Sequence, residues 1–224
     1  MFIMKRFTNI SGLTFIEVIV ALAINVILLS ALLAVFSANL NQYNRMQNSN
    51  TLNQQLQVAL DLMANDIRRA GYWGNASSDI GTGANNNPFM VTGSTDITVS
   101  GGNCILFTYD RSGNGSLATI SSASDDERYG FRLSNQTLQA RPPGATFACN
   151  AAANAWENLT DSTVVQITNL SFTLSSVSVP AGATTDMMLV RSVAISITGR
   201  LVSDTSVTKT LTKQVRIRND KFVP

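Results

Sequence analysis

The sequence predicts an α+β protein in which one long N-terminal helix lies against an antiparallel β-sheet. Three observations lead to this prediction. Residues 13–36 are an apolar run of membrane length. Apolar residues then recur at helical spacing, with no glycine or proline between Leu40 and Ala70. After Ile97 the chain breaks into short alternating segments, rich in β-branched and aromatic residues and separated by turn residues.

The apolar run, Leu13–Phe36, contains 24 residues. As a helix it would be about 36 Å long, at about 1.5 Å per residue, which is enough to cross a hydrocarbon core of about 30 Å. Glu17 lies near its start. A carboxylate inside a membrane helix costs roughly 2.5–3.5 kcal/mol at the centre and less near the end. Glu17 is therefore a candidate functional residue that needs a partner.

The motif G-L-T-F-I-E-V, which begins at Gly12 and follows a short basic leader, closely resembles the processing site of type IV prepilins. The resemblance implies that residues 1–12 are a leader peptide and that a prepilin peptidase cleaves after Gly12. It also implies N-methylation of Leu13. Glu17, with Thr14 in the same motif, would set the assembly register by neutralising the N-terminal amine of a neighbouring subunit.

Two other interpretations of the apolar run remain open, namely a plain single-pass anchor with a snorkelling Glu17 and a secretory signal cut near Ser37. Lys5 and Arg6 place the N-terminus in the cytoplasm in all cases. An ordinary signal has an apolar region of about 7–15 residues and no acid near its start, so it fits less well. Ala34 stands where major pilins often carry a helix-kinking proline.

We expect four segments. After the leader, residues 13–38 form the transmembrane and assembly half of the helix, and residues 39–71 form its amphipathic half. Residues 72–224 form a β-rich periplasmic domain. Gly71 is predicted to end the helix, because glycine adopts the left-handed conformation that helix ends often need. The apolar face that would cover the sheet consists of Leu52, Leu56, Ala59, Leu60, Met63, Ile67 and Ala70.

Alternating apolar residues mark the strands of the predicted sheet. Ser134-Asn135-Gln136 favours a hairpin turn, and a break in the alternation before Leu170 indicates a β-bulge. The aromatic residues Tyr72, Trp73 and Trp156 are expected in the core rather than in an exposed contact patch. The strand candidates are residues near Ile97–Val99, then Cys104–Asp110, Arg128–Leu133, Thr137–Arg141, Val164–Val179, Leu189–Leu201 and Val207–Arg218.

The amino-acid composition excludes several classes of function. The leader holds two of the 16 lysines and arginines, which leaves 14 basic against 14 acidic residues and argues against a nucleic-acid partner. The chain has no histidine, no zinc signature and no nucleophile motif, so we expect no catalytic residues and no enzyme activity. Cys104 and Cys149 fall after the span, where disulfides persist, so we expect them to pair. Free thiols or a catalytic cysteine are the alternatives.

One loop has the opening pattern of a calcium site. Asp110, Ser112 and Asn114 place oxygen atoms at positions one, three and five, and a glycine follows at position six. Position twelve is Ser121, where the motif needs a bidentate glutamate, although one of the acids 125–127 could replace it. A plain Gly/Asn turn is the alternative. Calcium is the one cofactor that the sequence raises.

Five further motifs resemble the PilW-type minor pilins: D-I-R-R-A-G-Y-W-G at Asp66, C-I-L-F-T-Y-D at Cys104, Y-G-F-R-L at Tyr129, W-E-N-L-T-D at Trp156 and V-R-I-R-N-D at Val215. This resemblance implies a single-pass protein of the Gram-negative inner membrane, with its globular domain in the periplasm. Such a protein helps initiate assembly of the type IV pilus, or fimbrium, and becomes part of the pilus tip.

The resemblance also implies partners. They are the prepilin peptidase, other minor pilins, the major pilin, the inner membrane and a large adhesin at the tip. Two alternative functions stay open: a type II secretion pseudopilin like the J component, and an adhesin or DNA-uptake module displayed on the pilus. The sequence does not choose between twitching motility, adhesion and DNA uptake as the role of the pilus.

Overall fold

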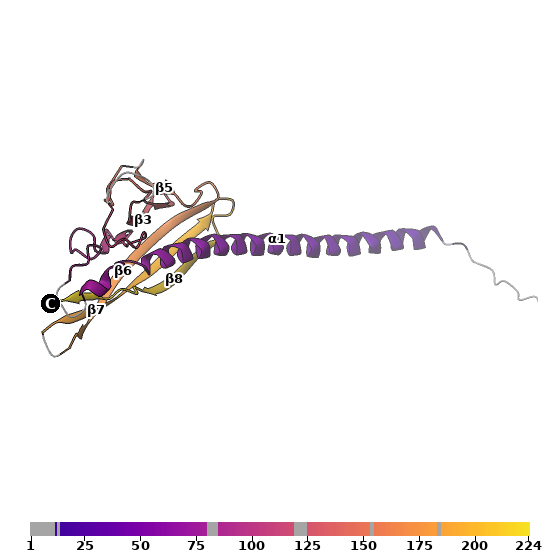
Figure 1. The fold of residues 1–224 in the computed structure, drawn as a ribbon. Helices are drawn as coiled ribbons and strands as arrows, with labels where there is room; N and C mark the ends of the chain where they lie inside the picture. The colour runs from indigo at the N-terminus through magenta and orange to yellow at the C-terminus, as the bar shows by residue number, and fades with distance from the viewer. Residues whose placement is uncertain (1–11, 13, 80–84, 119–124, 153–154, 183–184) are drawn as a thin grey trace, which may run out of the picture. The chain divides into compact units, whose positions relative to one another are not determined.

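The computed structural model describes residues 12, 14–79, 85–118, 125–152, 155–182 and 185–224 (Figure 1). The chain divides into two compact units, Met1–Gln47 and Asn48–Pro224. The long helix α1, Phe15–Ile67, contains 53 residues and passes through the boundary between them. The fold is α+β, as the sequence predicts, with one long N-terminal helix and antiparallel sheets.

In the first unit, every described residue from Thr14 to Gln47 is exposed. From Phe15 to Phe36 the helix is almost wholly apolar on all sides. Among the described helices, α1 alone is long and apolar enough to cross a membrane. Its two serines bond within the helix, because the hydroxyl groups of Ser30 and Ser37 donate to the carbonyls of Ile27 and Ala34 at 2.7 and 2.9 Å. These hydroxyl groups therefore need no water.

In the second unit, α1 buries one face against the sheets. A methyl group on Gly199 of β7 (Met187–Leu201) would lie only 2.9 Å from Leu56, so the absence of a side chain there permits the close approach of strand and helix. The predicted apolar face is confirmed in full, and Ala64 joins it. The buried residues of this face are Leu52, Leu56, Ala59, Leu60, Met63, Ala64, Ile67 and Ala70.

The helix ends at Ile67, a few residues before the predicted stop. The amide of Arg68 still donates four residues back, but those of Arg69 and Ala70 donate to carbonyls three residues back, at 3.0 and 3.1 Å, which tightens the last turn. Gly71 then takes a left-handed φ of 73° and donates its N–H to the carbonyl of Thr108 at 2.8 Å. Gly71 thus ends the helical segment as predicted, and it also ties the helix end to a strand.

The strands form two antiparallel sheets, a division that the sequence did not predict. Sheet A has the order β1-β2-β3-β4-β5. Its third and fourth strands are joined by the predicted turn, in which Asn135 and Gln136 have φ of 50° and 59°. The strands of sheet A are β1 (Thr98–Ser100), β2 (Cys104–Thr108), β3 (Arg128–Ser134), β4 (Thr137–Ala140) and β5 (Glu157–Asn158).

Sheet B has the order β6-β7-β8, and β9 also pairs with β7 (Figure 1). The predicted bulge is present as a register shift between Ile167 and Asn169. A short 3-10 helix, Ala76–Asp79, lies in the connection before sheet A. The strands of sheet B are β6 (Val165–Pro180), β7 (Met187–Leu201), β8 (Thr208–Arg216) and β9 (Lys221–Val223).

The core lies between the second half of α1 and the two sheets. Phe107 and Phe131 of sheet A, with Tyr109 just after β2, meet Ile167 and Ile195 of sheet B in one apolar cluster with the helix. The prediction of core aromatics holds for Trp156, which is 5% exposed. It is wrong for Tyr72, which directly follows the left-handed Gly71 and is 46% exposed. Trp73 is half-buried and donates its indole N–H to the carbonyl of Gly115 at 2.8 Å.

Candidate functional site

The N-terminal end of α1 is built around Thr14 and Glu17. The backbone N–H and the hydroxyl of Thr14 both donate to Oε2 of Glu17 at 2.8 Å. The amide of Glu17 in turn approaches the hydroxyl oxygen of Thr14 at 3.4 Å. This reciprocal pattern is a capping box, which fixes the first residue of a helix and holds a carboxylate at its positive end. Gly12 is exposed, and Leu13 lies outside the described residues.

Glu17 is also the one charged residue in the sequence between Phe15 and Asn44. It shares a shallow groove of about 320 Å³ with Ile16, Val20, Ala21 and Ile24. An apolar surface with a single carboxylate can bind a matching apolar surface that presents a single cation. The free α-amine of a processed subunit would be such a cation.

The structure joins Cys104 of β2 to Cys149 in a disulfide, with the two Cα atoms 6.0 Å apart. The bond closes a segment 45 residues long and belongs to a small second cluster with Leu106 and Trp156. It attaches the segment that follows β4 to the outer face of sheet A. Among the described residues no cysteine is free.

The loop that begins at Asp110 is held by hydrogen bonds rather than by the ligand geometry of a cation site. Oδ2 of Asp110 accepts the N–H groups of Gly74 at 2.8 Å and Gly115 at 2.9 Å, and Oδ1 accepts that of Gly113 at 2.6 Å. Burial raises the pKa of the Asp110 carboxyl, but these hydrogen bonds outweigh burial and hold it below its usual range. Ser112 contributes a weaker contact at 3.4 Å.

Glu127 reaches the same loop from the other side. Its two carboxylate oxygens accept the N–H groups of Ser112 and Ala118 at 3.0 and 3.1 Å. A calcium ion would need the oxygen atoms that now face N–H donors, and Asn114 uses its side-chain oxygen to accept from Ser116 at 2.8 Å. No group of three His, Cys, Asp or Glu side chains among the described residues could hold a metal ion, and Ser121 lies outside the described residues. The hydrogen bonds of Asp110, Ser112 and Asn114 favour the plain Gly/Asn turn over the calcium site.

A buried ion pair that the sequence did not reveal fixes the segment after β4. Asp126 accepts from Arg141 at 2.7 Å, from Arg128 at 2.9 Å and from the amide of Gly144 at 2.7 Å. Both arginines also face the ring of Phe147. The signal in the sequence was weak, because Asp126 lies beside two other acids in an ordinary loop pattern.

The family comparison decides what kind of protein carries these features. The model of one family, described as prepilin peptidase-dependent protein B, matches residues 45–217, more than three quarters of the chain. The chain belongs to the family of prepilin peptidase-dependent protein B. No curated protein and no solved structure matches it.

Membership in the prepilin peptidase-dependent protein B family makes this a pilin-like protein that depends on a prepilin peptidase. Proteins of this class are generally structural rather than enzymatic. The matched region starts at residue 45 and therefore leaves out Gly12, Thr14 and Glu17. The motif at the N-terminus and the family of the remaining chain are thus two independent observations that agree.

Proposed function

We propose that this protein is a minor pilin of the PilW type, which helps initiate assembly of a type IV pilus and is incorporated at or near its tip. One observation carries the proposal: the helix is exposed from Thr14 to Gln47 and buries nothing within its own chain, although it is almost wholly apolar from Phe15 to Phe36. A surface of this kind needs another apolar environment. The bilayer supplies it before assembly, and the helices of neighbouring subunits supply it afterwards.

The chemistry of processing follows from the first turn of α1. Cleavage after Gly12 would release the α-amine of Leu13 close to the capping box of Thr14 and Glu17. In the bilayer, Glu17 would remain near the interface. In the assembled fibre, its carboxylate would pair with the N-terminal amine of a neighbour, since an unpaired buried charge is strongly penalised. Subunits in the wrong register would leave both charges unpaired.

The globular unit fits the periplasmic side of this arrangement. Lys5 and Arg6 favour a cytoplasmic N-terminus, and a disulfide between Cys104 and Cys149 needs an oxidising compartment. The inner membrane, the prepilin peptidase, the other minor pilins and the major pilin are the proposed partners. A large tip adhesin would be a further partner.

Processing is tested on the membrane-expressed full chain, with and without an active prepilin peptidase. Edman sequencing and intact mass should show a new N-terminus at Leu13, carrying one methyl group, only with the active enzyme. A Gly12→Val variant should keep its leader, while an Ala34→Val variant in the same helix should be processed normally. An intact leader in the parent protein under both conditions would return Glu17 to the role of an anchor residue.

The type of machine needs a second experiment. Deletion of the gene in its host should abolish or strongly reduce surface pili, and the full chain should restore them. Immunogold labelling should find the protein at fibre ends. Normal piliation together with a loss of type II secretion would instead identify a J-like pseudopilin.

A further inference from the structure

A polar row crosses the whole of sheet A on the face away from α1. It takes one residue from each strand, in register: Ser100 pairs with Cys104, Cys104 with Arg132, Arg132 with Gln139, and Gln139 with Asn158. Gln139 donates its amide N–H to the side-chain oxygen of Asn158 at 2.8 Å and accepts the Nε–H of Arg132 at 2.8 Å. The row therefore fixes the orientation of the Arg132 side chain.

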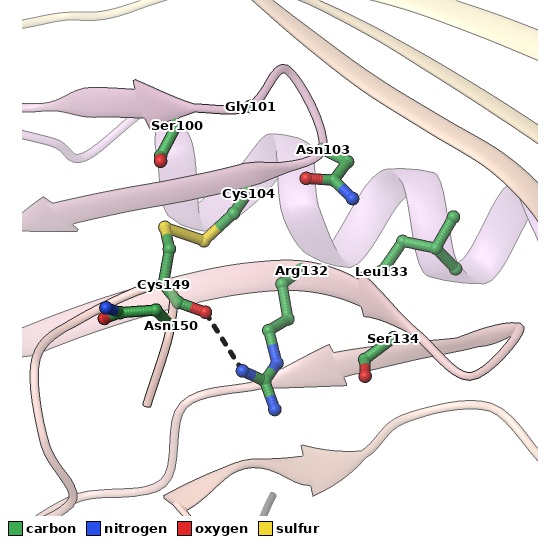
Figure 2. Close-up of a pocket in the computed structure, with 9 residues that line it drawn as sticks. All are labelled: Ser100, Gly101, Asn103, Cys104, Arg132, Leu133, Ser134, Cys149 and Asn150. Carbon is green, nitrogen blue, oxygen red and sulfur yellow. Dashed lines mark hydrogen bonds between the residues drawn. A yellow bond between two sulfur atoms is a disulfide. The ribbon is translucent and has the colours of Figure 1, made fainter. Parts of the chain in front are cut away.

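Arg132 is 8% exposed and only part of its donor capacity is used. A guanidinium has five N–H groups. Nε uses one on Gln139, and Nη1 uses two on the carbonyls of Cys149 and Ala151, at 3.0 and 2.9 Å. Figure 2 shows Nη1 joined to Cys149 and the other terminal nitrogen directed away from it. Nη2 has no hydrogen-bond partner among the described residues.

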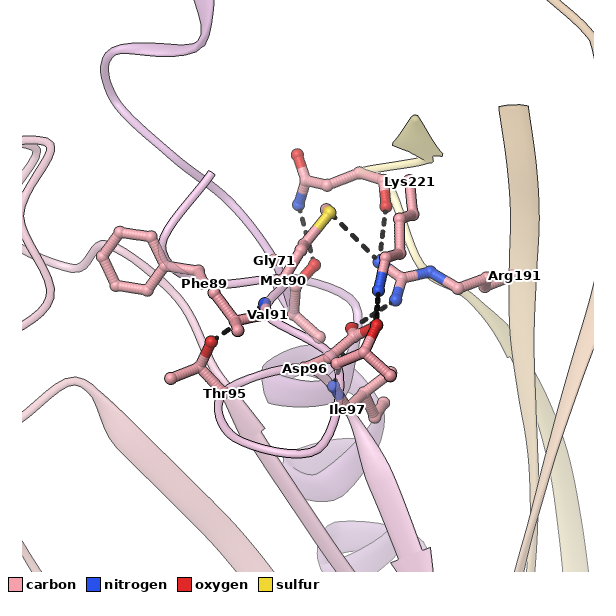
Figure 3. A network of polar contacts seen from close by, with 12 residues as sticks. Gly71, Phe89, Met90, Val91, Thr95, Asp96, Ile97, Arg191 and Lys221 are labelled. Carbon is pink, nitrogen blue, oxygen red and sulfur yellow. Dashed lines mark hydrogen bonds and ion pairs between the residues drawn. The ribbon is translucent and has the colours of Figure 1, made fainter. Parts of the chain in front are cut away.

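The electrostatic setting of Arg132 differs from that of the other buried arginines. Three arginines in the described part of the chain are buried: Arg132, Arg141 and Arg191. Arg141 pairs with Asp126 at 2.7 Å, and Arg191 pairs with Asp96 at 2.5 Å. Figure 3 shows the second of these pairs, in which Lys221 also contacts Asp96 at 2.7 Å.

Arg132 has no ion pair with any described residue, and each of its hydrogen-bond acceptors is neutral. Its guanidinium lies 4.5 Å above the ring of Trp156. Burial lowers the pKa of Arg132, because the charged form loses hydration. A buried cation without an anion is costly unless something outside the chain compensates it.

An open pocket adjoins this cation. It has a volume of about 320 Å³, and the disulfide between Cys104 and Cys149 forms part of its wall (Figure 2). Arg132 is the one charged residue that lines it. The rest of the polar lining consists of hydroxyl and amide side chains that can donate hydrogen bonds, from Ser100, Asn103, Ser134 and Asn150.

We propose that this pocket is a carboxylate-binding site in which Nη2 of Arg132 is the primary ligand. One cation balances one negative charge, which favours a carboxylate over a doubly charged phosphate. Arginine and carboxylate also match in geometry, and such charge-assisted hydrogen bonds are roughly twice as strong as neutral ones. The carboxylate belongs either to an acidic side chain of a partner protein or to a small free acid.

The stacking of Arg132 on Trp156 supplies the test. The chain has two tryptophans, so a Trp73→Phe background of the full chain in detergent leaves Trp156 as the only one. An anion that binds Arg132 will change the field at the indole and therefore its emission. The probes are sodium acetate, N-acetyl-glutamate α-amide as a side-chain mimic, and inorganic phosphate. Sodium chloride at equal ionic strength is the blank.

We expect a saturable change in emission with both carboxylates and none with chloride. Arg132→Gln should weaken the apparent affinity at least tenfold. Arg200→Gln is the matched control, because Arg200 also donates to a neutral glutamine, Gln166, at 3.0 Å, but in sheet B. It should leave the titration unchanged. Tighter binding of the glutamate mimic than of acetate assigns the site to a partner's side chain, and equal binding assigns it to a free acid.

Several outcomes would overturn the proposal. They are the lack of a saturable response in the parent protein, an equal response to chloride, saturation by phosphate alone, and a response that survives Arg132→Gln. Near-UV circular dichroism and the intact disulfide check that this variant is folded. If it is not folded, Arg132→Lys is the second variant. It keeps the positive charge but loses the planar guanidinium that can donate two hydrogen bonds to one carboxylate, so it should bind both carboxylates more weakly than the parent protein.

Discussion

Asp126→Asn is the sharpest test of how the globular unit is held together. Asp126 is 1% exposed and takes part in ion pairs with Arg128 and Arg141. Burial alone would raise the pKa of this carboxyl, but hydrogen bonds from Arg128, Arg141 and the amide of Gly144 lower it to about 2. The substitution keeps the shape of the side chain and removes its charge. It therefore leaves Arg141, which is 5% exposed, without a carboxylate.

The expected cost follows from that uncompensated charge. Breaking one side of a buried ion pair typically costs about 3–5 kcal/mol, whereas replacing both partners can be nearly neutral. We expect Asp126→Asn to lower the free energy of unfolding by about 3 kcal/mol. The double variant with Arg141→Met should lose less than the single one, although Arg141 also donates to the carbonyls of Arg128 and Ala145.

Urea unfolding of the full chain in detergent, in the Trp73→Phe background and followed by the emission of Trp156, measures these differences. Asp61→Asn is the matched control, because Asp61 pairs with Lys213 at 2.5 Å but its side chain is 44% exposed. Exposed pairs contribute about 0–1 kcal/mol. If Asp126→Asn costs no more than Asp61→Asn, the argument from burial is wrong. A double variant with Arg141→Met that is less stable than the single one would contradict it too.

The ion pairs of Asp126 also predict that the free energy of unfolding falls at acid pH. The folded pKa of Asp126 lies below its unfolded value of about 3.9, so its contribution is complete above that value and is lost as the pH falls towards 2. A shift of nearly two units corresponds to about 2.5 kcal/mol. The stability difference between the parent protein and Asp126→Asn should therefore shrink by about 2 kcal/mol between pH 5 and pH 2, and the remainder is lost below pH 2. A constant difference across this range would contradict the assignment.

Three further predictions concern the other sites. Glu17→Gln keeps a capping partner for Thr14 but removes the charge of the carboxylate. Membrane insertion and processing should be normal, while the amount of protein in sheared pili, measured on immunoblots, should fall at least tenfold. Normal incorporation would refute the register role. Replacing Cys104 and Cys149 by serine should cost about 4 kcal/mol in urea unfolding, from the entropy of a 45-residue loop, and reductant should leave this variant unchanged. Millimolar calcium or a chelator should not shift the melting temperature, because the loop acids already accept N–H groups; a calcium-dependent rise would restore the metal site.

Much of the fold was predictable, because it follows from periodicity. The buried face of α1 repeats at steps of three and four, and the bulge before Leu170 appears as a break in alternation. Gly71 ends the helical segment for a reason visible in any sequence, namely its tolerance of positive φ. These features depend on residues that lie close together in the chain, which is why local sequence patterns were enough to predict them.

The features that were missed depend on pairing between distant segments. The division into two sheets and the short strands β5 and β9, of two and three residues, leave no periodic signal. The burial and the hydrogen-bond partners of Arg132 depend on the register of five strands. Within the sequence of its own strand, Arg132 looks like an ordinary solvent-facing charge. Tyr72, next to the left-handed Gly71, is exposed although its residue type favours burial. Only the folded structure shows which of these residues are buried and which are exposed.

The use of charge in the globular unit bears on how partners would be recognised. Asp110, Asp126 and Glu127 are buried and bind donors of their own chain, while Arg141 and Arg191 are buried against their own acids. Charges of both signs are thus withdrawn into the fold, and without the proposed leader the composition has equal numbers of basic and acidic residues. The surface after the proposed processing would therefore stay close to neutral. Long-range electrostatic steering is then weak. Partner choice in the proposed assembly would rest instead on short-range features, of which the apolar helix with its one carboxylate and the unpaired guanidinium of Arg132 are the two most specific.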